Sequence, residues 1–376
     1  MGDLGEAHMR YEIYTSNTPN AVDAAEEIIR QISFEPATIL FFAPNDGFTY
    51  YTKALKEQYL YAEVFGVTAT TVFTAKNTED DALTVCVMDD GVECHGGILE
   101  EISRYPDKYK QRITDCANRL TGLSNTVCLE FTAAFYGCEE LVLDTLNTAL
   151  APYRIPVAGG STGIKGDACL NLVSYNGVVY EEAAIFLLMH NKNGRICLFR
   201  EDIFYPTKTS FYATDVNIQK RMVSEFDERP AADVLAEALG VSKEKLSERL
   251  LFHPLGRKSG GDIYMTDGNE ILPDGSITFY ASVYGNTRMV LMNLGDYRTI
   301  MQDTIKRIRR EVPRPRLSMM INCYSRTQLF RREDFVEEFR TAYEELFGNK
   351  FFCFTGFGEQ LYGAHLNQTL LMLVFE

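Results

Sequence analysis

The chain has 376 residues, of which 46% are hydrophobic and 24% charged, so it is long enough for two domains with well-formed cores. Its formal net charge of -15 argues against a nucleic-acid partner, because that affinity depends on Lys and Arg side chains that neutralise phosphates. The sequence shows neither a membrane span of roughly 18 apolar residues nor the apolar core of a signal peptide, which predicts a cytoplasmic protein.

Cysteine usage agrees with that location. Nine cysteines are scattered along the chain, and no two form a Cys-x-x-Cys motif. An odd number, with several members inside apolar runs, favours reduced thiols in a reducing compartment.

One pattern occurs three times along the chain: a buried strand, a loop, a helix, a second strand and a glycine-containing turn. The first copy begins with the apolar residues 39–42 and ends at residues 64–68. An amphipathic helix is predicted before it at residues 21–33, with Asn20 as its cap. The apolar strand at residues 82–88 is expected to close this copy as an antiparallel partner.

The second copy runs from the strand at residues 127–131 through a helix at residues 139–150 to the segment IPVAGGST at residues 155–162. Asn176-Gly177 predicts a two-residue hairpin turn after it. We expect this copy to repeat the antiparallel closure with strands at residues 171–174, 178–179 and 183–189.

Different material separates the second copy from the third. A short helix is predicted at residues 230–239, with Pro230 at its start and Gly240 at its end. A boundary near residue 220 therefore divides the chain into predicted domains at residues 9–220 and 221–376. Turn-rich β-structure is expected from His253 onward.

The third copy starts with the strand at residues 319–323, continues through an amphipathic helix at residues 335–347, and ends at residues 351–359. The nearly continuous apolar run at residues 369–375 predicts a strand buried on both faces. The fold class is therefore α/β, with two domains, mixed β-sheets covered by helices, and internal strand-helix-strand pseudo-repeats. Repeats stacked in one sheet would place their turns along one edge, where open α/β sheets receive ligands.

A basic run precedes the third copy, at residues 306–310, and continues into Arg314 and Arg316. It is typical of a helix C-terminus, since cations suit that end of the helix dipole. The alternative is a docking site for an acidic partner.

An ordered series of short motifs resembles the FIST sensory proteins, which join a FIST-N and a FIST-C domain. These motifs are IPVAGGST at residues 155–162, FHPLG at 252–256, NCYSR at 322–326, GFGEQ at 356–360 and HLNQT at 365–369. The resemblance covers nearly the whole chain from about Tyr14.

The resemblance implies an intracellular small-molecule-binding sensory protein in signal transduction, with amino acids among the proposed ligands. Some members of that family bind haem, and others carry an output domain. This chain has no room for a kinase, cyclase or F-box segment, so it resembles a stand-alone member. We therefore expect a separate signalling protein as its output partner.

The ligand hypothesis centres on Arg326 and Glu359, each of which follows a strand of the third copy. A guanidinium can bind a carboxylate with two charge-assisted hydrogen bonds, and a carboxylate can bind an ammonium group, which together suit an amino acid. The alternative is that Arg326 and Glu359 pair with each other. The predicted ligand-binding residues are Arg326, Glu359, Cys323, Ser325, Thr355, Gly356, Gly358, Asn367, Gly159, Gly160, Ser161 and Thr162.

The last four residues of that set belong to the second copy, where a glycine turn could bind an anion through its backbone amides. The alternative is a glycine turn where strands pass closely.

Two chemical alternatives remain open. Cys323 could act as an enzymatic nucleophile, with Arg326 nearby and His365 across the cleft, although a cysteine that ends an apolar strand is usually a buried hydrophobe. Haem ligation by His190 or His253 is the other alternative. We expect no catalytic role, no metal and no cofactor. For a metal, the reason is that neither His253 nor His95 has a ligand companion at a recognised spacing.

Overall fold

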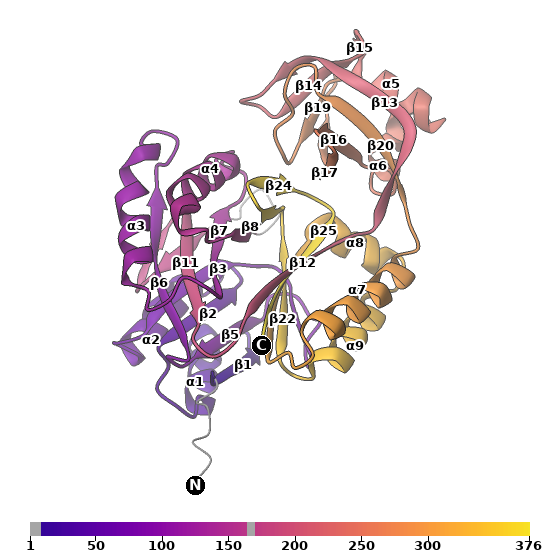
Figure 1. Ribbon diagram of the computed structural model, residues 1–376. Helices are drawn as coiled ribbons and strands as arrows, with labels where there is room; N and C mark the ends of the chain where they lie inside the picture. The colour runs from indigo at the N-terminus through magenta and orange to yellow at the C-terminus, as the bar shows by residue number, and fades with distance from the viewer. Residues whose placement is uncertain (1–8, 164–169) are drawn as a thin grey trace.

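The computed structural model describes residues 9–163 and 170–376, and it confirms the α/β class with mixed sheets covered by helices. The repeating unit in the structure contains more elements than the sequence predicted. Three units each follow the order strand, helix, strand, helix, strand, except that unit 3 has two helices between its second and third strands, and a further domain is inserted into unit 3 (Figure 1). These four parts are described in turn.

Unit 1 consists of β1 (Tyr11–Ser16), α1 (Ala21–Gln31), β2 (Thr38–Ala43), α2 (Phe48–Gln58), β3 (Glu63–Thr68), β4 (Val72–Thr74) and β5 (Leu83–Met88). Unit 2 consists of β6 (Val92–Glu100), α3 (Lys110–Arg119), β7 (Thr126–Ala133), α4 (Glu139–Leu150), β8 (Val157–Thr162), β9 (Val173–Tyr175), β10 (Val178–Tyr180) and β11 (Ala183–Asn191). The short 3-10 helices Pro106–Tyr109 and Ala151–Tyr153 also belong to unit 2.

Unit 3 consists of β12 (Ile196–Asp202), α7 (Tyr297–Glu311), β21 (Leu317–Cys323), α8 (Tyr324–Arg332), α9 (Val336–Phe347), β22 (Phe351–Gly356), β23 (Glu359–Leu361), β24 (Ala364–Leu366) and β25 (Thr369–Phe375). The inserted domain separates β12 from α7. It consists of β13 (Phe204–Asn217), β14 (Met222–Phe226), β15 (Arg229–Pro230), α5 (Ala231–Leu239), a 3-10 helix (Lys243–Lys245), α6 (Leu246–Leu250), β16 (Leu255–Ser259), β17 (Asp262–Thr266), β18 (Gly268–Ile271), β19 (Ile277–Phe279) and β20 (Arg288–Leu294).

The three units exchange strands. Each builds a sheet around two parallel strands and one antiparallel neighbour: β2, β3 and β5; β7, β8 and β11; and β21, β22 and β25. The next position in each sheet is filled from another unit, by β9 beside β3, β23 beside β8 and β4 beside β22. The predicted boundary near residue 220 lies between β13 and β14, and these exchanged strands tie together the segments on either side of it.

The inner faces of the three sheets share one core, which explains the continuous apolar strands. Phe42, Phe131 and Phe354, one from each unit, meet there with ring centroids 5.3 to 5.7 Å apart. Aromatic pairs at this spacing add to the stabilisation from buried area. Helices cover the outer faces, and β25, predicted to be buried on both sides, is buried along its whole length.

Local signals placed most elements within a few residues. Asn20 caps α1 by accepting hydrogen bonds from Val22 N and Asp23 N, as predicted. Asn176 and Gly177 form the hairpin turn with positive φ angles of 48° and 88°. Gly240 ends α5 in the left-handed conformation.

Two expectations need correction, and one helix was not predicted. The hairpin of β9 and β10 does not close unit 2, because it pairs with β3 in the first sheet, and β11 alone supplies the closure. Gly159 and Gly160 lie inside β8 and form no turn. Glycine is needed at position 159 because a Cβ there would come within 2.1 Å of Glu130 O in the neighbouring strand. Residues 324–332, left unassigned from the sequence, form α8.

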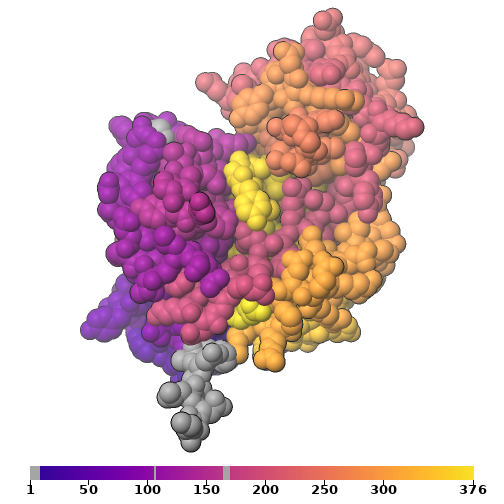
Figure 2. Space-filling view, viewed as in Figure 1, coloured from indigo at the N-terminus to yellow at the C-terminus, as the bar shows by residue number. Residues whose placement is uncertain are grey.

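The inserted domain packs on one end of the three-sheet body (Figure 2), and the turn that joins β23 and β24, at Tyr362 and Gly363, is exposed between the two. The eight cysteines in the described ranges are free thiols; Cys169 lies outside those ranges. Within the same ranges, the helices are all too short or too polar to cross a lipid bilayer.

Candidate functional site

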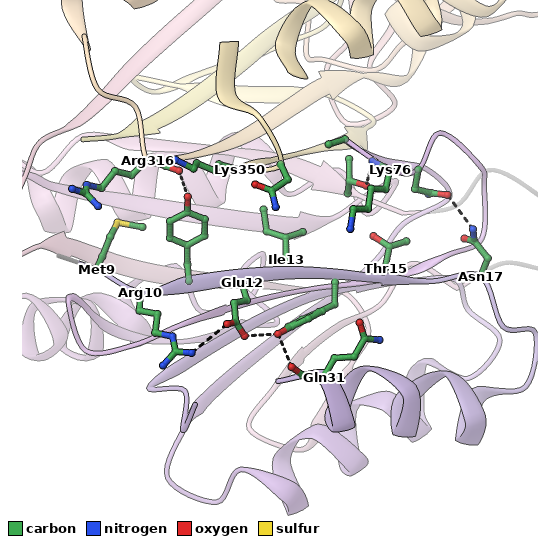
Figure 3. Close-up of a pocket in the computed structure, with 16 residues that line it drawn as sticks. Met9, Arg10, Glu12, Ile13, Thr15, Asn17, Gln31, Lys76, Arg316 and Lys350 are labelled. Atoms are coloured by element: carbon green, nitrogen blue, oxygen red, sulfur yellow. Dashed lines mark hydrogen bonds and ion pairs between the residues drawn. The ribbon is translucent and has the colours of Figure 1, made fainter. Parts of the chain in front are cut away.

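A groove of about 800 Å³ runs along β1, at the opposite end of the body from the inserted domain (Figures 1 and 3). It is bordered by the sequence around β4 and by the starts of β21 and β22. The residues predicted to bind a ligand lie elsewhere, beneath the inserted domain.

The carboxyl ends of the parallel strands converge, although the three repeats form three separate sheets and not the single sheet that the sequence predicted. Thr68, Ser161 and Thr355 hold equivalent positions, and each backbone N–H donates to the exchanged strand beside it, at Leu172 O (3.0 Å), Gly358 O (2.8 Å) and Thr71 O (3.0 Å). The three side chains are buried at the junction. Thr162 Oγ1 donates a hydrogen bond to Thr68 O across it. Protein side chains therefore fill the place where the three strand ends meet. Ser161 and Thr162 form hydrogen bonds with other protein groups there.

Arg326 does not face an open cleft. Its side chain is 1% exposed and forms an ion pair with Glu201 of β12, while its Nη1 donates to Glu201 O at 3.2 Å. Tyr343 Oη donates to the other carboxylate oxygen of Glu201 at 3.3 Å, and Phe330 lies 5.0 Å from the guanidinium. This partner could not be recognised from the sequence, because the inserted domain separates β12 from the rest of unit 3 along the chain. The sequence suggested that Arg326 binds a ligand or pairs with Glu359, and the ion pair with Glu201 agrees with neither interpretation.

Glu359 begins β23 and is fully buried. One carboxylate oxygen accepts hydrogen bonds from Thr369 N (3.2 Å) and Thr369 Oγ1 (2.7 Å), and the other has no partner among the described residues. Burial raises the pKa of Glu359 well above its usual value, which favours the neutral acid. This carboxyl group is therefore unsuited to bind an ammonium ion.

Of the other residues predicted in unit 3, Gly356 and Gly358 allow close backbone packing, and Asn367 forms a hydrogen bond to the inserted domain. Gly358 adopts φ 153°, and a Cβ there would lie 2.5 Å from His365 Nε2. Gly356 ends β22, where a Cβ would come within 3.0 Å of Ser161 O. Asn367 Oδ1 accepts a hydrogen bond from Asp267 N at 3.1 Å, which ties unit 3 to the inserted domain.

Cys323, Ser325 and Asn367 do meet, and they line a narrow slot with Tyr280 and Phe357. The slot shares three of its lining residues with a cavity of about 230 Å³ between the inserted domain and α8, the shared ones being Tyr280, Tyr324 and Ser325. The cavity wall also includes the polar side chains of Glu248, Asn269, Glu270 and Gln328.

Asp267, which sequence reasoning missed, is buried beside this slot. Burial raises its pKa from 3.8 to about 6, although Ser325 and Gln368 oppose the rise. Its Oδ2 atom and the amide oxygen of Gln368 lack hydrogen-bond partners among the described residues. In the sequence, Asp267-Gly268 signalled only a turn after a strand, so nothing local marked a site.

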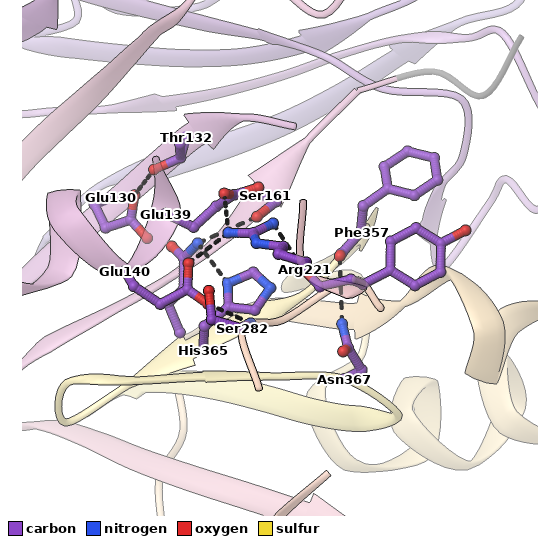
Figure 4. A network of polar contacts seen from close by, with 12 residues as sticks. Glu130, Thr132, Glu139, Glu140, Ser161, Arg221, Ser282, Phe357, His365 and Asn367 are labelled. Atoms are coloured by element: carbon purple, nitrogen blue, oxygen red, sulfur yellow. Dashed lines mark hydrogen bonds and ion pairs between the residues drawn. The ribbon is translucent and has the colours of Figure 1, made fainter. Parts of the chain in front are cut away.

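A second polar network joins the inserted domain to unit 2 (Figure 4). Arg221 forms ion pairs with Glu139, at 2.6 Å, and with Glu140 at the start of α4. Ser282 N donates to Glu140 Oε1 at 2.8 Å. Burial raises the pKa of Glu140, but the charges of His365 and Arg221 and the N–H of Ser282 lower it to about 2. The network therefore holds an ionised carboxylate under the inserted domain.

Cys323 sits at the N-terminus of α8, a position that can activate a thiol. Here burial raises its pKa well above the usual value, and the charges of Glu359 and Asp267 add to the rise. His365, the predicted base, lies 3.4 Å from the Gln360 amide. This thiol has the features of a structural cysteine more than those of a nucleophile.

The two histidines considered for haem are both engaged within the protein. His190 Nδ1 lies 3.1 Å from Thr126 Oγ1, and His253 Nδ1 lies 2.9 Å from Asn293 Oδ1. They occupy different parts of the fold, on β11 and just before β16.

Comparison with protein families gives two matches that together cover most of the chain. A FIST N domain matches residues 37–229, and a FIST C domain matches residues 231–362. No curated protein matches the chain significantly. The two matched segments meet at β15 and α5, so both contribute strands to the inserted domain.

Proposed function

The chain belongs to the FIST family, whose domains act as sensory domains in signal transduction, and from this premise we propose that it binds a small polar molecule between the inserted domain and α8. The observation that carries the proposal is the group of buried polar atoms without partners beside that cavity. An unsatisfied buried polar group costs about 1–3 kcal/mol, and Asp267 and Gln368 contribute one such oxygen atom each. A polar ligand that reached them would remove that cost.

An amino acid is the ligand class that we propose. The first N–H groups of α8 have no intrahelical partner, and Cys323 provides no side-chain cap, so this end of the helix suits a carboxylate. Asp267 and the rings of Tyr280 and Tyr324 offer a carboxylate and aromatic faces for an ammonium group. This arrangement replaces the earlier assignment of Arg326 and Glu359 to the same two roles.

The position of the cavity suggests how binding would become a signal. The inserted domain contacts unit 3 through Asp267 and Asn367, and unit 2 through Arg221 and Glu140. A ligand between the inserted domain and α8 would favour the arrangement in which both contacts form, because a ligand shifts an equilibrium toward the state that it binds better. A separate signalling protein would then read the position of the inserted domain.

A thermal-shift screen over the amino acids tests the proposal, followed by calorimetric titration of any compound that raises the midpoint. Saturation at about 100 times the dissociation constant should stabilise the protein by roughly 2.7 kcal/mol. Asp267→Asn should weaken binding at least tenfold, whereas Asp262→Asn, at an exposed position of β17, should leave it unchanged. A screen without a hit, or unchanged affinity in Asp267→Asn, would contradict the proposed ligand chemistry.

A further inference from the structure

The groove along β1 has properties that the proposed ligand site does not explain. Tyr11 Oη donates to Arg316 O at one end, and Asn17 Nδ2 donates to Asn77 Oδ1 at 3.2 Å at the other (Figure 3). Between these two bridges, Ile13 and Thr15 face an open groove of about 800 Å³. The groove therefore runs along one edge of β1, and the two bridges mark its ends.

The strand that borders the groove has an unpaired edge. β1 pairs antiparallel with β5, and Asp89 N donates to Arg10 O at 2.9 Å. Because hydrogen-bonded positions alternate along an antiparallel pair, the backbone groups of Tyr11, Ile13 and Thr15 point to the opposite edge. Within residues 9–163 and 170–376, no strand pairs with that edge.

The other two units offer an internal comparison, because β6 and β12 occupy the equivalent edge of their sheets. On β6, Gly96 N donates to the Glu63 carboxylate at 3.2 Å. On β12, Arg200 O accepts a hydrogen bond from Arg307 Nη2 at 2.7 Å. A side chain from a neighbouring element thus bonds a backbone group on each of these two strands. Among the described residues, no side chain bonds the edge of β1 in this way, although exposed strand edges invite association and proteins normally block them.

The groove is also positively charged in a chain with a formal charge of -15. Its lining contains four cationic side chains, Arg10, Lys76, Arg316 and Lys350. Glu12 is the one carboxylate of the lining, and it already accepts hydrogen bonds from Arg10 and from Ser33 Oγ. The excess of positive charge at this place attracts an anionic partner.

We propose that the free edge of β1 binds an extended acidic segment of a partner protein by strand addition. Backbone hydrogen bonds to Tyr11, Ile13 and Thr15 would supply affinity, and the cations at the rim would select acidic side chains. A second copy of this chain is a poorer occupant, because two identical basic grooves repel each other. The proposal concerns a different surface from the amino-acid site and does not depend on it.

The first experiment uses the intact protein and fluorescein-labelled ten-residue peptides, with binding followed by fluorescence anisotropy. A peptide of alternating Glu and Val should bind, and the Lys-Val counterpart should not. Two further peptides carry N-methyl groups on every Glu or on every Val. Since alternate residues of a strand present their N–H groups to opposite edges, one of these peptides should lose at least tenfold in affinity and the other should retain it.

The second experiment changes the protein. Lys76→Glu combined with Lys350→Glu should weaken the Glu-Val peptide at least tenfold. The matched control, Lys53→Glu combined with Lys220→Glu, makes the same charge change at exposed positions outside the groove and should have no effect.

Three results would overturn the proposal. Equal binding of both N-methylated peptides, with displacement by a single-stranded polynucleotide, would mean attraction by charge alone. Equal loss of affinity in the groove variant and in its control would place the peptide elsewhere. Self-association in sedimentation, abolished by Ile13→Pro, would assign the edge to a second copy of this chain.

Discussion

Replacing Asp267 with Asn should stabilise the ligand-free protein, although it removes a group that we assign to ligand binding. Burial raises the pKa of this carboxyl from 3.8 to about 6. Each pKa unit corresponds to ~1.4 kcal/mol, so the ionised side chain destabilises the folded state by about 3 kcal/mol. Asn has nearly the same shape and no charge, so the variant should recover up to about that amount at pH 8.

The pH dependence identifies the cause. Below pH 3.8 both states of the protein hold the proton, and Asp267 contributes nothing to the difference between variant and wild type. As the pH rises from 3.8 to about 6, the unfolded chain releases the proton and the folded chain keeps it, so wild-type stability falls. Above pH 6 the gap between the two proteins should be constant.

Urea denaturation of both proteins at pH values from 4 to 8 measures this gap. Asp274→Asn is the control, because hydrogen bonds from Ser276 lower the pKa of that exposed carboxyl, and its removal should not stabilise the protein. An Asp267→Asn variant that is less stable than wild type at pH 8, or a gap independent of pH, would refute the reasoning.

Other expected outcomes concern the buried contacts. Arg326→Met should destabilise the protein by about 3–5 kcal/mol in urea, because it leaves the buried Glu201 side chain without its ion-pair partner. Adding Glu201→Leu should recover most of the loss, and full stability of Arg326→Met would contradict a structural role for Arg326. In limited proteolysis of Arg221→Ala, the inserted domain should be cleaved before the three-sheet body, because the ion pairs with Glu139 and Glu140 are lost. Simultaneous cleavage of both parts would mean that these ion pairs do not hold the inserted domain in place. Gly159→Ala should yield insoluble protein, because its Cβ would collide with Glu130 O, whereas Gly261→Ala, with open space around it, should be tolerated. Thiol labelling of the native protein should modify Cys197 before the buried Cys323, and rapid labelling of Cys323 would revive the enzymatic alternative.

Much of the fold could be predicted from local patterns. The strands β2 and β25 are nearly continuous apolar runs, and Asn20, Gly240 and Asn176-Gly177 mark a cap, a helix end and a turn in the conformations that these residues favour. Such signals depend on neighbours a few residues away. The threefold repeat was visible for the same reason.

The candidate site was predicted only in part. Cys323, Ser325 and Asn367 do line one slot, because they follow strands of the same unit. Arg326 was misjudged because its partner Glu201 lies 125 residues earlier, on the far side of the inserted domain. Asp267 was missed because its burial is created by contacts between separate parts of the chain.

The sequence by itself determined most of the secondary structure, the repeat and the family, since these follow from backbone preferences, periodic burial and ordered motifs. Only the tertiary structure decided that each unit donates a strand to another sheet, which glycines lie inside strands, and which charges are buried in pairs. The reason is physical: a side chain's burial, and hence its pKa and its availability to a ligand, depends on distant segments that no local pattern encodes.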